Sequence, residues 1–109
     1  MKKFLDALNG LKIAFNHKSV IIQIILGVIA IIGGLIIKLD YYEWFAFIIC
    51  IVLVIMAEIF NTSIEKIGNY LSIEKDEKIK QIKDLSSAAV LITSIGALVV
   101  CIICVIRRM

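Results

Sequence analysis

Long apolar runs, separated by polar segments, dominate the chain. Residues 19–37 and 86–106 contain no charged side chain, and residues 44–57 form a third apolar run that ends at the acid Glu58. Because an α-helix rises about 1.5 Å per residue, roughly 20 apolar residues cross a hydrocarbon core about 30 Å thick. The pattern predicts an all-α membrane protein with one domain. Its expected transmembrane helices are 19–37, 44–60 and 86–106; the second extends to about residue 71, and a cytoplasmic loop covers 72–85.

Residues 1–18 have the pattern of an amphipathic helix rather than of a further span. Apolar side chains recur at helical spacing, at Phe4, Leu8, Leu11 and Phe15, among lysines, asparagines and an aspartate. Such a helix lies in the membrane interface, where basic residues favour an anionic leaflet. A solvated arm is the alternative. The polar positions interrupt any signal-peptide core, and no small-residue cleavage pattern follows, so we expect this segment to be retained.

Composition and charge narrow the class of protein. Hydrophobic residues make up 61% of the chain and proline is absent, whereas a soluble domain carries about 45–50% apolar residues. Nine of the twelve Lys and Arg precede the first span or lie between the second and third. The positive-inside rule then places the N-terminus and the 72–85 loop in the cytoplasm and the C-terminus outside. The net charge of +3 reflects this topology, and no nucleic-acid partner is expected.

The three cysteines, Cys50, Cys101 and Cys104, lie inside the expected second and third spans. Cys101 and Cys104 have the spacing of a redox pair or of half a zinc site. Their neighbours are apolar, however, so a thiolate there would lack both solvation and further ligands. We expect all three cysteines to pack as small hydrophobic side chains.

The most informative segment joins the second span to its cytoplasmic extension. Glu58, Asn61, Thr62 and Glu65 stand at i, i+3, i+4 and i+7, and Asn69 follows one turn later, so these side chains share one helix face. An acid costs about 2.5–3.5 kcal/mol at the centre of a span and less near its end. A polar stripe that runs from membrane depth into the cytoplasm suits a site joining a lipid to a polar, metal-bound cosubstrate.

Two other interpretations of Glu58 stay open on these residues alone. One is a protonated acid that hydrogen-bonds between helices, with Glu65 solvated at the interface. The other is the carboxylate of a small multidrug transporter. That class has four spans and carries its acid in the first, whereas the first span here contains no acid.

The segment before the third span mixes both signs of charge. Acids and lysines recur at i,i+4 spacing in residues 74–84, which is typical of a solvated helix face. Lys83 and Asp84 differ because they abut the expected membrane boundary. A lysine there can neutralise phosphate, and a carboxylate can orient a polar ligand.

Two motifs resemble the signatures of the small bacterial integral-membrane lipid kinases, the family of prokaryotic diacylglycerol kinase and undecaprenol kinase. Residues 57–65, AEIFNTSIE, are similar to the A-E-x-x-N-[ST]-[AS]-I-E signature. Residues 83–91, KDLSSAAVL, are similar to K-D-x-x-[AS]-[AG]-A-V-L. The separation of the two motifs fits without a gap, and the likeness covers roughly residues 4–106.

The resemblance implies ATP-dependent phosphorylation of a membrane lipid alcohol, either diacylglycerol or undecaprenol. It further implies a homotrimer with shared active sites at the cytoplasmic side of the bacterial inner membrane. Glu58 matches the catalytic base, and Glu65 matches a ligand of the Mg²⁺ of MgATP. The positions that match nucleotide contacts are Asn61, Glu65, Glu74, Lys75, Asp76, Lys83 and Asp84. Those expected to contact the lipid are Phe15, Glu58 and Ser87.

Lys75 and Asp76 depart from the family's usual Tyr-His, and two further departures weaken its acidic cluster. Aligning residues 10–15, GLKIAF, with its G-[LI]-[KR]-x-A-x segment puts Lys18 where the family carries a second metal-binding glutamate. Asn69 stands where many relatives have aspartate. Asp6 lies twelve residues before Lys18, about 18 Å along a helix, and is a poor substitute. The alternatives to an active kinase are therefore a degenerate relative that binds lipid or nucleotide without turnover, and a small membrane scaffold.

Overall fold

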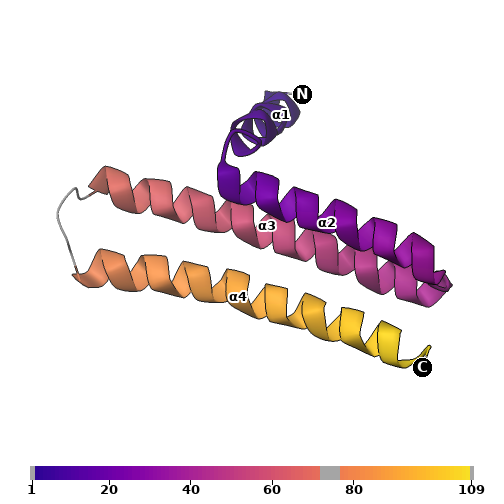
Figure 1. Cartoon of the computed structure of the whole chain (residues 1–109). Helices are drawn as coiled ribbons and strands as arrows, with labels where there is room; N and C mark the ends of the chain where they lie inside the picture. The colour runs from indigo at the N-terminus through magenta and orange to yellow at the C-terminus, as the bar shows by residue number, and fades with distance from the viewer. Residues whose placement is uncertain (1, 72–76, 109) are drawn as a thin grey trace.

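The computed structural model describes residues 2–71 and 77–108, and this part of the chain is built from α-helices. The helices are α1 (Lys2–Ala14), α2 (Lys18–Ile37), α3 (Tyr41–Leu71) and α4 (Glu77–Ile106), shown in Figure 1. The last three are long and apolar enough to cross a membrane. The three spans expected from the apolar runs are therefore confirmed as helices of sufficient length and composition.

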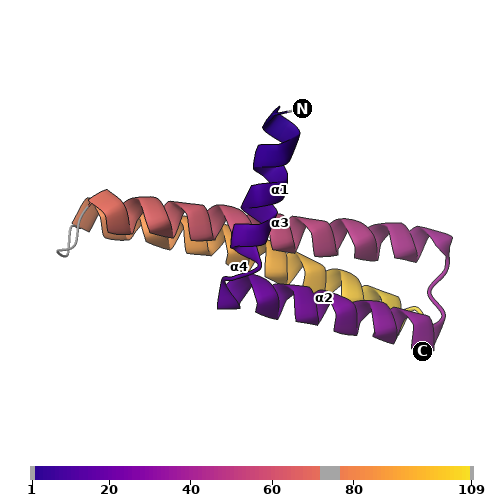
Figure 2. The same cartoon turned by 90° about the horizontal axis from the view of Figure 1, so that it is seen from above.

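α3 runs antiparallel to both α2 and α4 (Figures 1 and 2) and packs against both. Its contact with α4 is more extensive than its contact with α2. α1 leaves this bundle sideways from the start of α2 (Figure 2). With the bundle crossing a bilayer, α1 has the orientation that an interfacial helix requires.

α3 and α4 are 31 and 30 residues long, whereas α2 has 20 residues. At about 1.5 Å per residue, the two longer helices exceed a hydrocarbon core by roughly 15 Å. The structure differs from the sequence-based expectation at residues 77–85, which were expected in a loop and belong to α4. An i,i+4 ion pair between Lys80 and Asp84, 3.0 Å long, supports the helix there, and neither glycine nor proline interrupts it.

The short connection between α2 and α3 is fixed by local hydrogen bonds. Lys38 adopts a left-handed conformation (φ 58°, ψ 63°) that ends α2, and its N–H donates to the carbonyl of Gly34. Asp40 and Glu43 then form a capping box: each backbone N–H donates to the other's carboxylate, at 3.0 and 2.9 Å. The absence of a side chain at Gly34 lets Leu39 fold back onto α2.

Arg108 ties the ends of the three long helices together at this end of the bundle. Its guanidinium donates two hydrogen bonds to Glu43, one of them 2.6 Å long, and others to backbone carbonyls at the end of α2 and in the last turn of α4. Arg107 adds ion pairs to Asp40 and Glu43 at 3.5 and 3.3 Å. The hydrogen bonds to Glu43 raise the pKa of Arg108 above its ordinary value.

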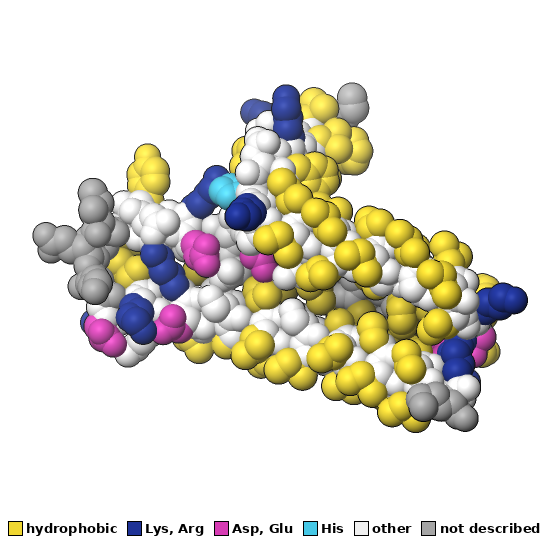
Figure 3. Space-filling model, viewed as in Figure 1, with side chains coloured by type: hydrophobic (Ala, Val, Ile, Leu, Met, Phe, Trp, Pro, Cys, Tyr) yellow, Lys and Arg dark blue, Asp and Glu magenta, His cyan; other side chains and the backbone are white. Residues whose placement is uncertain are grey.

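Few apolar side chains are buried within the single chain. The buried hydrophobic cluster consists of Leu39, Phe47 and Cys104. Most other large apolar side chains of α2, α3 and α4 point outward, as the space-filling view shows along the bundle (Figure 3). An outward apolar surface of this kind is what a lipid-embedded bundle presents.

Candidate functional site

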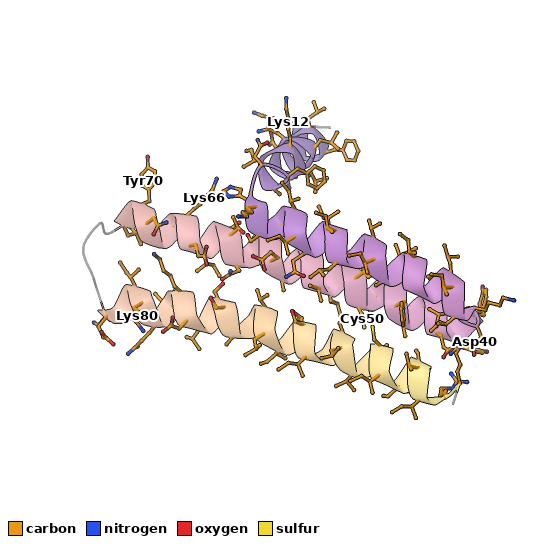
Figure 4. The ribbon with its side chains drawn as sticks, viewed as in Figure 1. Lys12, Asp40, Cys50, Lys66, Tyr70 and Lys80 are labelled. Carbon is orange, nitrogen blue, oxygen red and sulfur yellow. The ribbon has the colours of Figure 1, made fainter. Side chains whose placement is uncertain are left out.

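A polar section of the α3–α4 contact lies toward the end of the bundle marked by Lys66 and Lys80 in Figure 4. The buried residues of α3 in this section are Glu58, Asn61 and Gly68, and α4 contributes the buried Ser86. The structure therefore buries two members of the polar stripe expected from the sequence. Ser86 was not among the predicted site residues, because a serine at the start of an apolar helix carries no specific signal of a site.

Gly68 sets how closely α4 approaches α3. A Cβ atom added there would lie 2.7 Å from Cε of Lys83 and 3.2 Å from Cγ2 of Ile79. Ile79, Lys83 and Ser86 recur at i, i+4 and i+7, so they share one face of α4. Since the helices are antiparallel, this face brings Lys83 beside Gly68 and Ser86 about one turn nearer to Glu65.

Glu58 is 6% exposed, and in the described ranges no side chain donates a hydrogen bond to its carboxyl group. Thr62 donates to the backbone carbonyl of Glu58 instead, at 2.9 Å. Ionisable residues at membrane depth are typically functional. The alternative interpretation requires a hydrogen bond from Glu58 to another helix, and no such hydrogen bond is seen among the residues that the structure describes.

Asn61 and Glu65 form the next turn of the site. The amide Nδ2 of Asn61 donates to Oε1 of Glu65 at 3.2 Å. Oδ1 of Asn61 is buried and has no hydrogen-bond partner within the described chain. This turn therefore contains the exposed carboxylate of Glu65 and the buried amide oxygen of Asn61, which has no partner among the described residues.

Lys83 reaches across from α4 to the last turn of this stripe. Its Nζ donates a hydrogen bond to Oδ1 of Asn69. This contact joins a predicted nucleotide residue to Asn69, the last position of the polar stripe predicted from the sequence. The sequence could not predict the pairing, because it depends on the register between α3 and α4.

Other predicted site residues lie apart from this cluster. Asp84 pairs with Lys80 in a largely exposed contact on α4. Ser87 is exposed, and Phe15 is exposed in the turn between α1 and α2. Glu74, Lys75 and Asp76 lie outside the residues that the structure describes.

A small crevice separates the α1–α2 turn from α3. It has a volume of about 70 Å³, and its lining includes His17, Thr62, Ser63 and Lys66. His17 directly precedes Lys18, the first residue of α2. The crevice therefore places His17, the residue before Lys18, close to Thr62 of the polar stripe.

An apolar groove of about 480 Å³ opens between α2, α3 and α4. Cys50 and Cys101 line it, with Gly27 and Phe47. All three cysteines of the chain are free. Their expected role as small packing residues thus agrees with their surroundings.

The described residues contain no group of three or more His, Cys, Asp and Glu side chains able to hold a metal ion. Mg²⁺ nevertheless needs only one or two protein carboxylates when phosphate oxygens complete its coordination. The exposed carboxylate of Glu65 fits that role. The donor set therefore suits a cation delivered with a phosphate ligand rather than one bound by protein alone.

Three helices long and apolar enough to cross a membrane, with a buried acid in the polar section between two of them, are the features of a small membrane protein. The chain matches the family described as prokaryotic diacylglycerol kinase over residues 6–105, and it belongs to that family. A diacylglycerol kinase of Helicobacter pylori (strain ATCC 700392 / 26695) is 35% identical over 85 residues. That match covers 77% of this chain and 66% of the relative, slightly less than two thirds of the relative's length. The resemblance seen in the two sequence motifs is confirmed at the level of the family.

Proposed function

We propose that this protein is a lipid kinase that transfers the γ-phosphoryl group of ATP to the hydroxyl of a membrane lipid. The observation that carries the proposal is the largely buried side chain of Glu58, whose carboxyl group accepts no hydrogen bond from the described residues, on the same helix face as Asn61 and Glu65. Such an arrangement offers a proton acceptor at membrane depth and polar ligands one to two turns nearer the aqueous phase.

Glu58 is the catalytic base of this proposal. The lipid hydroxyl loses its proton as its oxygen attacks the γ-phosphorus, and a positioned carboxylate accelerates such a step by about 10²–10⁴-fold. The carboxyl group of Glu58 has no intramolecular donor to satisfy among the described residues, so it is available to a hydroxyl entering from the lipid.

Charge at the phosphates comes from the next turns of the site. Glu65 would hold the Mg²⁺ of MgATP, with Asn61 as a polar member of the same site, and this ion would supply positive charge to the phosphate oxygens when it is bound. Lys83 contributes an ammonium group from α4. Asp84, with Glu74, Lys75 and Asp76, completes the proposed nucleotide contacts.

The proposed assembly is a homotrimer in the bacterial inner membrane with the site on its cytoplasmic side. Phe15 and Ser87, which with Glu58 are the proposed lipid contacts, are exposed on the single chain and lie apart from the polar section of the α3–α4 contact. In the trimer, Phe15 and Ser87 of one copy would contact the site of a neighbouring copy, because they do not reach the site of their own chain. The distribution of Lys and Arg supports a cytoplasmic N-terminus and an external C-terminus.

The relative from Helicobacter pylori carries the name diacylglycerol kinase, which makes diacylglycerol the first substrate to test. Undecaprenol presents the same chemistry, a single hydroxyl on an apolar body. Transfer of radiolabel from ATP should therefore be measured with the purified protein in mixed micelles that contain either lipid. Labelled phospholipid in one or both reactions supports the proposal, and no labelled lipid in either rejects it.

The second candidate is a relative that binds nucleotide without turnover. Lys18 favours it, because a cation begins α2 where the family carries a metal-binding glutamate, and no acid occupies the first turn of this helix. Saturable nucleotide binding, together with the absence of labelled product from both lipids, would identify this case.

A further inference from the structure

Asn61, Glu65 and Asn69 form an amide–carboxylate–amide series along one face of α3. Their spacing of four residues places neighbouring side chains about 6 Å apart along the helix axis and on the same face. The two amides have different partners: Nδ2 of Asn61 donates to Glu65, and Oδ1 of Asn69 accepts from Lys83. One amide therefore binds the carboxylate, and the other binds the ammonium group.

Lys83 has an oppositely charged group one helical turn from the amide that it contacts. A lysine carries its charge on a flexible four-carbon stem, so a group about one turn away is within its range. Lys83 nevertheless pairs with Asn69, and the ion pairs of the described residues do not include Lys83 with Glu65. The positive and negative groups are adjacent but not neutralised by each other.

Gly68 explains the path of the Lys83 side chain. A Cβ atom at Gly68 would lie 2.7 Å from Cε and 3.6 Å from Cγ of Lys83, so the lysine stem lies against the bare backbone of α3. This path delivers Nζ to Asn69, the next residue. An amide oxygen accepts the hydrogen bond and leaves the positive charge uncompensated.

We propose that Asn69 is a positioning residue that holds Lys83 away from Glu65, so that both charged groups stay available to ligands. The inference rests on the proposed function, in which the ammonium group meets phosphate and the carboxylate meets Mg²⁺. Without the amide of Asn69, Lys83 turns to Glu65, and the resulting ion pair competes with both ligands.

The test uses full-length protein in micelles with ¹⁵N-labelled lysine side chains. The Nζ signal of Lys83 is assigned as the one lost in Lys83→Arg. In the parent protein, Glu65→Gln should leave this signal in place. In the Asn69→Leu background, Glu65→Gln should shift it, because the new ion pair is then removed. Gln81→Leu, which removes an exposed amide from α4, is the matched control and should behave like the parent.

Kinetics provide the second measurement. An exposed ion pair contributes about 0.2–1 kcal/mol, so competition from it raises the KM for MgATP by up to about fivefold. Asn69→Leu should show this rise with little change in kcat, and Asn69→Gln, which retains an amide, should restore the parent value. A rise in KM that Asn69→Gln fails to reverse would overturn the role of the amide.

The two measurements separate this inference from the proposed function. A Lys83 signal that responds to Glu65→Gln in the parent protein, or that ignores it in Asn69→Leu, overturns the positioning role whether or not the protein is a kinase. Absence of lipid phosphorylation by the parent protein rejects the proposed function, and the NMR comparison still decides the pairing of Lys83.

Discussion

Gly33 and Gly34 are adjacent in α2 but have opposite surroundings, and this contrast gives a sharp test of the packing. A Cβ atom at Gly34 would lie 2.7 Å from Cδ1 of Leu39 and 2.9 Å from Cη2 of Trp44. A Cβ atom at Gly33 would meet nothing within 4 Å. We therefore expect Gly34→Ala to strain the α2–α3 connection and Gly33→Ala to be tolerated.

The expected magnitude follows from two opposing effects. Overpacking a close contact costs typically about 1–3 kcal/mol. Replacing glycine by alanine inside a helix gains roughly 0.5–1 kcal/mol, and this gain applies equally to both positions. The difference in unfolding free energy between the two variants is therefore about 1–3 kcal/mol, with Gly34→Ala the less stable.

Trp44 makes this difference directly measurable. It is the single tryptophan of the chain, and it contacts the α2 surface at Gly34. Unfolding of micelle-bound protein by added sodium dodecyl sulfate, followed through tryptophan fluorescence, should show an earlier transition for Gly34→Ala. Equal midpoints, or an earlier transition for Gly33→Ala, would refute the packing of Leu39 and Trp44 on Gly34.

Three further variants test other parts of the molecule. Glu65→Gln should raise the Mg²⁺ concentration needed for half-maximal turnover before it abolishes turnover; no rescue by excess Mg²⁺, with nucleotide binding unchanged, would remove Glu65 from metal binding. Lys18→Glu should lower that concentration or raise the rate, and no effect on either would show that residues 10–18 are wrongly aligned with the family. Arg108→Ala should lower stability equally at neutral and mildly alkaline pH. Because the pKa of Arg108 is raised, its charge, and with it its contribution to stability, is lost only above both of these pH values. A loss of stability at only one of the two pH values would contradict the clamp.

The sequence predicted the long helices because apolar length is a direct consequence of bilayer thickness. The expected span 19–37 lies within α2 (Lys18–Ile37), and the extension to about residue 71 agrees with the end of α3 at Leu71. The start of α4 at Glu77 was missed, because a hydropathy pattern detects the membrane segment of a helix and not its polar continuation. The i,i+4 charge spacing of residues 74–84, which includes Lys80 and Asp84, was the signal of this polar part of the helix.

In the candidate site too, the sequence predicts what depends on spacing within one helix and not what depends on contacts between helices. Helical spacing alone predicts that Glu58, Asn61 and Glu65 share a face. The contact of Lys83 with Asn69 requires the register between α3 and α4, which short-range spacing does not define. The clamp of Arg108 on Glu43 joins residues 65 positions apart. From sequence, Arg108 contributed only a charge to the topology.

Lipid phosphorylation that depends on Glu58 is the most direct test of the central claim. Radiolabel transfer from ATP to diacylglycerol and to undecaprenol should be compared for the parent protein, Glu58→Gln and the exposed control Glu77→Gln. The parent and the control should label at least one lipid, and Glu58→Gln should be at least about 10²-fold slower while keeping the same oligomeric state, because it cannot accept the proton. A Glu58→Gln variant that labels lipid at the parent rate would contradict the account.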